Sequence, residues 1–78
     1  MITSKGYDDQ DWTLVYEFDS VPVQLGTCLV ASDGAEFRLD GGRAPHNSSS
    51  TGRVWVANAD LNVVEFYPGV FGLKWVVL

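Results

Sequence analysis

Apolar side chains recur at every second position through most of this chain, with polar side chains between them. No stretch has the spacing of an amphipathic helix. The alternation is clear in AEFRL, residues 35–39, and in VFGLKWVV, residues 70–77. In WTLVYEF, residues 12–18, it places Trp12, Leu14, Tyr16 and Phe18 on one face of a strand. The nearest approach to a helix is NADLNV, residues 58–63, which is long enough for one turn. The pattern predicts an all-β protein.

The number and length of the predicted strands indicate a small antiparallel barrel or sandwich. Strands without a covering helix bury their apolar faces best by packing or curling against one another. We favour an open, SH3-like barrel of about five to six strands. Residues 11–78 then form a single β domain, residues 1–10 a flexible acidic N-terminal tail, and residues 41–52 a mobile loop. The predicted strands lie near 11–19, 23–32, 35–40, 53–58, 63–67 and 70–77.

Asp33-Gly34, between two apolar runs, is the strongest turn signal. A two-residue type I′ turn needs a positive φ at both central positions, which this dipeptide tolerates. Such a turn would place Val30 opposite Phe37, and directly opposed residues share a face of the sheet. We therefore expect Val30 and Cys28 to point into the core.

A second turn is predicted at Tyr67-Pro68-Gly69-Val70, where proline and glycine stand in the order of a type II turn. This turn type twists poorly into a two-residue hairpin, so we expect a longer loop or a bulge. Gly72 could supply that bulge or a bend.

Composition restricts the chemistry available to the chain. Its 78 residues contain one cysteine, Cys28, and one histidine, His46, which exclude an internal disulfide and make a closed zinc site implausible. We expect no metal and no cofactor. No segment has the composition of a signal peptide or of a membrane span, so we expect no membrane partner and a cytoplasmic location.

The charge distribution argues against nucleic acid as a partner. Residues 1–40 carry eight acidic residues and two basic ones, a net charge of −6 within a chain of net charge −5. Nucleic-acid binding requires clustered lysine and arginine to neutralise phosphates. An acidic surface remains available to a basic protein partner.

The segment LDGGRAPHNSSSTGRVWV, residues 39–56, contains most of the polar residues that could do chemistry. It lacks the Gly-Lys-Ser/Thr spacing of a phosphate-binding loop. A serine, His46 and Asp40 could supply a catalytic triad, but a loop without a rigid scaffold would not hold them in hydrogen-bonding geometry. We predict that the protein is not an enzyme, and keep a small anion-binding hydrolase using His46 as a distant alternative.

Trp55 is the strongest candidate for contact with a partner. In RVWV, residues 53–56, the two valines share one face, and Arg53 and Trp55 share the other. If the valines face the core, Trp55 is exposed beside Arg53, and these residue types are enriched at binding hot spots. The alternative is that Trp55 simply packs within a small barrel. The candidate partner-binding residues are Arg43, His46, Arg53 and Trp55.

VQLGTCLVASDGAEFRLDGG, residues 23–42, resembles small uncharacterised bacteriophage proteins, especially those of phages that infect actinobacteria. The residues that carry the likeness are Gly26, Thr27, Asp33, Gly34 and Arg38. The resemblance implies the cytoplasm of a bacterial host, and it transfers no functional residues.

These observations favour a non-enzymatic binding or accessory protein that is encoded by a phage and acts on a host or phage protein. The alternative is a self-assembling structural subunit whose strand edges, or whose C-terminal WVVL at residues 75–78, pair between copies.

Overall fold

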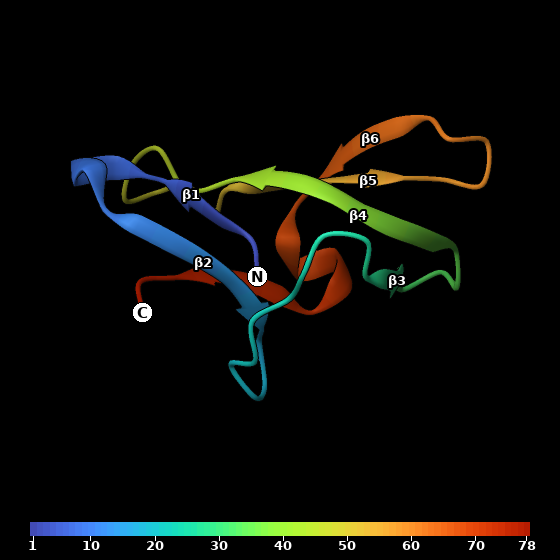
Figure 1. Cartoon of the computed structure of the whole chain (residues 1–78), viewed down its shortest axis with the longest axis horizontal. Coiled ribbons are helices and arrows are strands. Elements are labelled where there is room, and N and C mark those ends of the chain that lie inside the picture. The colour runs from blue at the N-terminus through green and yellow to red at the C-terminus, as the bar shows by residue number, and fades with distance from the viewer.

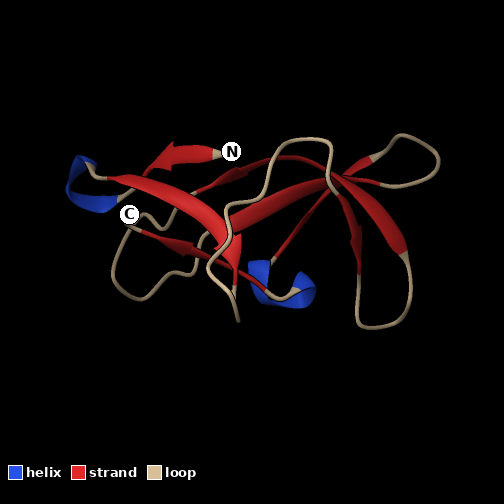
Figure 2. Cartoon of the chain, turned by 60° about the horizontal axis from the view of Figure 1, so that its bottom comes forward, coloured by secondary structure: helices blue, strands red, loops and turns tan.

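A computed structural model describes all 78 residues and confirms an all-β protein (Figures 1 and 2). Seven antiparallel strands form two sheets, and the remaining regular structure is two short 3-10 turns, η1 and η2. Their bounds are β1 Thr3–Lys5, η1 Tyr7–Asp9, β2 Asp11–Tyr16, β3 Cys28–Val30, β4 Glu36–Arg43, β5 Arg53–Ala57, β6 Val63–Phe66, η2 Pro68–Phe71 and β7 Leu73–Val76.

The strands are ordered β1-β2-β7 in a first sheet and β3-β4-β5-β6 in a second, larger one. Hydrogen bonds do not join the two sheets into a closed barrel. In Figure 1 the β5–β6 hairpin projects away from the first sheet, at the upper right. The second sheet therefore ends in a strand, β6, that has a neighbour on one side only.

A single apolar core draws on both sheets. Phe37, Phe66 and Phe71 pack edge to face beside it, with ring centroids 5.4 to 5.8 Å apart. Because Phe71 belongs to η2, these contacts attach the turn before β7 to the second sheet. The buried core residues are Ile2, Leu14, Val23, Leu29, Leu39, Ala44, Val54, Val56, Leu73 and Trp75.

The first ten residues, expected to form a tail, contribute a strand and a core residue. Thr3–Lys5 pairs with β2, and Ile2 is buried in the core. The Lys5 Nζ lies 3.1 Å from Asp11 Oδ1 across the two strands. The acidic composition of residues 1–10 suggested a tail, but the segment also contains the apolar residue Ile2. Ile2 is buried in the core, and the strand that follows it, β1, pairs with β2.

The hairpin at Asp33-Gly34 has three loop residues, Ser32 to Gly34, rather than two. The Ala31 N–H donates to the Ala35 carbonyl at 2.9 Å, and the Gly34 N–H donates to the Ala31 carbonyl at 2.9 Å. Only Gly34 has a positive φ, at +89°. This is a three-residue loop with glycine in the left-handed position, and the predicted type I′ turn was wrong.

The extra loop residue shifts the register by one and reverses the faces of β3. Leu29 pairs with Phe37 and is buried, whereas Cys28 pairs with Arg38 and is exposed. Val30 is 57% exposed. The prediction that Cys28 and Val30 face the core was wrong, because a slip of one residue moves every side chain to the opposite face.

Two other local expectations differ from the structure. β2 ends at Tyr16, so Phe18 lies in the following loop, is 97% exposed and does not share a strand face with Leu14. The segment after Tyr67 forms the 3-10 turn Pro68–Phe71 rather than a type II turn. Gly72, with φ +70°, caps this turn and directs the chain into β7.

The β5–β6 hairpin repeats the same loop geometry with leucine in the left-handed position. The Leu61 N–H donates to the Asn58 carbonyl at 2.9 Å, and Leu61 has a φ of +64° with 80% of its surface exposed. A left-handed conformation costs a residue with a Cβ about 1–2 kcal/mol, and asparagine tolerates it better. We expect Leu61→Asn to raise the free energy of unfolding by about 0.5–1 kcal/mol.

Urea denaturation followed by circular dichroism measures this gain. Leu25→Asn is the control, because Leu25 is also exposed, at 61%, but has no positive φ. An equal change in both variants would show that polarity, and not backbone strain at Leu61, sets the stability.

Candidate functional site

The loop between β4 and β5 spans residues 44–52, since Gly41–Arg43 continue strand β4. Ala44 and Gly52 at its ends are buried, and the Pro45 carbonyl accepts a hydrogen bond from the Tyr7 N–H at 3.1 Å. Within the loop, Asn47 Oδ1 accepts from the Ser49 N–H at 3.0 Å. Both ends of this connection are therefore anchored in the fold, and its polar middle faces solvent.

His46 is exposed and lines a polar hollow of about 450 Å³ together with Arg53 and Tyr67. The Ser49 hydroxyl donates to Asn47 Oδ1 at 2.9 Å rather than to the imidazole. Ser49 is therefore not hydrogen-bonded to His46 as a nucleophile would be to its base.

Arg43 and Arg53 lie directly opposite each other on β4 and β5. Glu65 Oε1 on β6 lies 3.9 Å from Arg43 Nη2 and 3.8 Å from Arg53 Nε. The guanidinium carbon of Arg53 also stands 4.1 Å from the centroid of the Tyr67 ring. Such partly exposed ion pairs contribute little stability, and they place both guanidinium groups beside the same carboxylate.

Trp55 lies next to these residues on the same face of the second sheet. It pairs with Gly41 on one side and with Glu65 on the other. A Cβ at Gly41 would be 2.9 Å from Trp55 Cε3, so the indole covers the glycine. Val54 and Val56 are fully buried and Trp55 is 38% exposed, which confirms the predicted sorting of the two faces of β5.

Three of the four predicted residues thus meet on one surface, and the fourth, His46, borders it through the hollow shared with Arg53. We call this surface the arginine–aromatic cluster; it consists of Arg43, Arg53, Trp55, Glu65 and Tyr67. Two arginines against one glutamate leave it with one positive charge in a chain of net charge −5.

Glu65 and Tyr67 were not predicted as site residues. The spacing of NADLNV permits a single helical turn, although its two asparagines and Asp60 are typical of a hairpin loop. Asn58 Oδ1 accepts hydrogen bonds from the Asp60 and Asn62 N–H groups, at 2.9 and 3.0 Å. A hairpin loop over residues 58–62 pairs β5 with β6 and places Glu65 beside Trp55.

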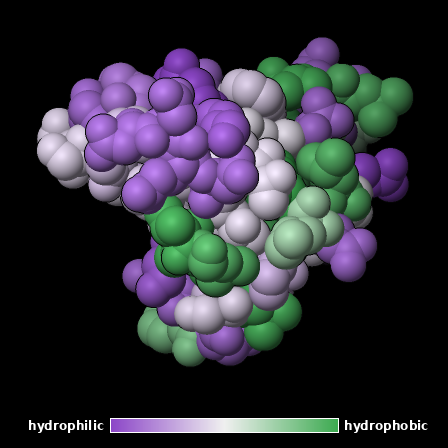
Figure 3. Space-filling model, turned by 60° about the vertical axis from the view of Figure 1, so that its left-hand side comes forward, coloured by the Kyte–Doolittle hydropathy of each residue, from purple (hydrophilic) through white to green (hydrophobic).

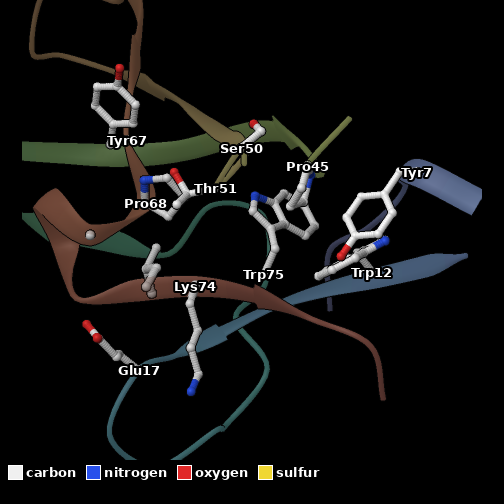
Figure 4. A pocket seen from close by; sticks show the side chains of 12 residues that line it. Tyr7, Trp12, Glu17, Pro45, Ser50, Thr51, Tyr67, Pro68, Lys74 and Trp75 are labelled. Atoms are coloured by element: carbon white, nitrogen blue, oxygen red, sulfur yellow. The ribbon is translucent and has the colours of Figure 1, made fainter. Parts of the chain in front are cut away.

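A second hollow, of about 440 Å³, lies between the first sheet and the 44–52 loop (Figure 4). The Trp75 ring is central among the side chains around it, and Pro68 and Trp12 lie on opposite sides of that ring. The Trp12 Nε1–H is buried and has no hydrogen-bond partner. The other labelled residues around the hollow are Tyr7, Glu17, Pro45, Ser50, Thr51, Tyr67 and Lys74.

The face of the molecule seen in Figure 3 combines hydrophilic regions with several separate apolar patches. No three histidine, cysteine, aspartate or glutamate side chains gather in a way that could hold a metal ion. The structure also contains no helix with the length and apolar character needed to cross a membrane. Comparison with protein-family models, curated proteins and solved structures returned no match.

Proposed function

We propose that this protein is a non-enzymatic binding protein that contacts a partner protein through the arginine–aromatic cluster. The observation that carries the proposal is the placement of Trp55 between Gly41 and Glu65, with two oriented arginines on the same sheet face. Tryptophan, tyrosine and arginine dominate the binding energy of protein interfaces. Here all three residue types share a rigid support.

Arg53 is the pre-organised member of the cluster, which lowers the entropic cost of its binding to a partner. Arg53 is held by Glu65, by the Tyr67 ring, and by a 2.7 Å hydrogen bond from Nη1 to the Gly52 carbonyl. Arg43 is more exposed and contacts the same carboxylate. The fitting partner surface offers an apolar group to Trp55 and carboxylate or carbonyl oxygens to the free guanidinium N–H groups.

The resemblance to small phage proteins supports a partner in the cytoplasm of a bacterial host, so we propose an accessory role there. An anion-binding hydrolase centred on His46 has less support, because the imidazole is exposed and the Ser49 hydroxyl bonds to Asn47 instead. An SH3-like open barrel stays a proposal about the architecture; the irregular register between Leu39 and Gly41 in β4 supports the strong bending it requires.

Trp55→Ser tests the binding surface. Immobilised wild-type protein is expected to retain one or a few proteins from a bacterial host lysate in near-stoichiometric amounts. Trp55→Ser should retain at least about tenfold less, because hot-spot truncation costs about 2 kcal/mol or more. Quantitative mass spectrometry of the retained proteins measures the loss.

Phe18→Ser is the matched control, since it removes a more exposed aromatic ring from a loop outside the cluster. Circular dichroism establishes that both variants are folded. Retention of the same proteins in the same amounts by Trp55→Ser would exclude the cluster as the contact surface.

A further inference from the structure

Strand β6 has unpaired backbone groups along its outer side. The Asn58 N–H donates to the Asn62 carbonyl at 3.0 Å, which marks these residues as a hydrogen-bonded pair of the β5–β6 hairpin. Such pairs alternate along an antiparallel ladder, so Val64 and Phe66 bond to β5. Val63 and Glu65 therefore direct their N–H and C=O groups to the free edge.

This edge lacks the features that usually prevent strands from pairing between molecules. Proteins protect edges with lysine, proline, bulges or a covering segment. β6 contains no lysine or proline, its pairing with β5 is regular, and no other strand pairs with its outer side. Its one charged residue, Glu65, is compensated by Arg43 and Arg53 of the same chain. Apolar side chains are exposed on both of its faces, with Val63 55% and Val64 38% exposed.

We propose that β6 pairs antiparallel with β6 of a second copy of this chain, with Val64 opposite Val64 of that copy. Outward-facing residues can bond only to outward-facing residues. Placing Val63 opposite Glu65 of the second copy, and Glu65 opposite Val63, satisfies the free groups of both residues in each chain. A register with Val63 opposite Val63, or Glu65 opposite Glu65, pairs only one of them within β6.

Charge supports the same register. Glu65 faces a valine of the second copy, the second Glu65 lies only on the diagonal, and each carboxylate is already compensated by Arg43 and Arg53 of its own chain, which weakens like-charge repulsion across the interface. The register also directs Leu61 of one chain toward Tyr67 of the other, and these side chains are 80% and 59% exposed.

The pairing joins the two four-stranded sheets into one sheet of eight strands, in which directly opposed residues share a face. Both Trp55 side chains then lie on the same side of the assembly. If the proposed function holds, the dimer binds its partner through two clusters at once, which raises the apparent affinity.

Disulfide trapping tests the register in a Cys28→Ser background. Val64→Cys should oxidise to a covalent dimer, because Cβ atoms of directly opposed residues lie about 4.5–5.5 Å apart. Val63→Cys should form at least about tenfold less, since the two copies of residue 63 are diagonal, roughly 7–8 Å apart. Non-reducing gel electrophoresis measures both yields, and equal yields would refute the register.

Sedimentation equilibrium of the pure Cys28→Ser protein tests the association itself. The average mass should rise with concentration from 8.6 kDa toward twice that value. Val64→Lys should remain monomeric and folded, because Val64 is partly exposed in the single chain. A parent protein that stays monomeric at millimolar concentration would refute the dimer. This holds even if β6 then proves to pair with a different protein.

Failure of the dimer and failure of the proposed function are distinguishable. Sedimentation uses pure protein with no partner, whereas the capture experiment follows Trp55. A monomeric Val64→Lys variant that still captures the partner would retain the binding function as a property of the single chain.

Discussion

Replacing Trp75 with alanine is expected to lower the free energy of unfolding by about 3–5 kcal/mol. Trp75 belongs to β7 in the first sheet, is 6% exposed, and packs against the second sheet. A Cβ at Gly42 of β4 would lie 2.7 Å from Trp75 Cζ2, so the indole fills the space that this glycine leaves. Removing it opens a cavity between the sheets that neither backbone can readily fill.

Urea denaturation followed by circular dichroism measures the loss, which is a large part of the roughly 4–12 kcal/mol expected for a domain of this length. Trp55→Ala is the control, because it removes the same ring from the solvent-facing side of the second sheet. We expect it to cost about 1 kcal/mol. Equal losses in the two variants would contradict the assignment of Trp75 as the contact between the sheets.

Gly52→Ala is expected to be nearly as destabilising, by about 2–5 kcal/mol. Gly52 has a φ of +74°, which costs an L-residue with a Cβ about 1–2 kcal/mol. A Cβ there would also lie 2.5 Å from the Arg43 carbonyl oxygen and 2.6 Å from Trp75 Cδ1. The backbone oxygen cannot move without disturbing the β4–β5 pairing, so the added methyl group cannot be accommodated without loss of stability.

Gly34→Ala separates the two contributions. Gly34 has a φ of +89°, and a Cβ there would have no atom within 4 Å, so alanine meets only the conformational cost, about 1 kcal/mol. Thermal or urea unfolding of both variants measures the difference. If Gly52→Ala were no more destabilising than Gly34→Ala, close packing at the start of β5 would be excluded as the reason for the glycine.

These two positions, Trp75 and Gly52, connect the fold to the candidate site. Gly52 immediately precedes Arg53, and the Gly52 carbonyl holds Arg53 Nη1. Trp75 Nε1 lies 3.4 Å from the Arg53 carbonyl, a long hydrogen bond from the first sheet to the first residue of β5. The orientation of the arginine–aromatic cluster therefore depends on core contacts that lie behind it.

The sorting of the β5 side chains onto two faces could be predicted from the sequence because their alternation is regular. Val54 and Val56 alternate with Arg53 and Trp55, and burial of the valines leaves the other pair on the solvent side. The position of Glu65 could not be derived in the same way. Deriving it requires the length of the β5–β6 loop. The glycine that would mark the left-handed position of such a loop is absent, because leucine occupies that position.

The alternation of side chains by itself determined that the chain forms strands and that Arg53 and Trp55 share the face of β5 opposite to that of Val54 and Val56, because a period of two is a property of the extended backbone. Only the tertiary structure decided the register of β3 and the contribution of residues 1–10. Asp33-Gly34 is compatible with loops of two or three residues, and the two registers differ in which side chain is buried opposite Phe37. Leu29, rather than Val30, occupies that position, and the choice depends on how both sheets fill one shared core.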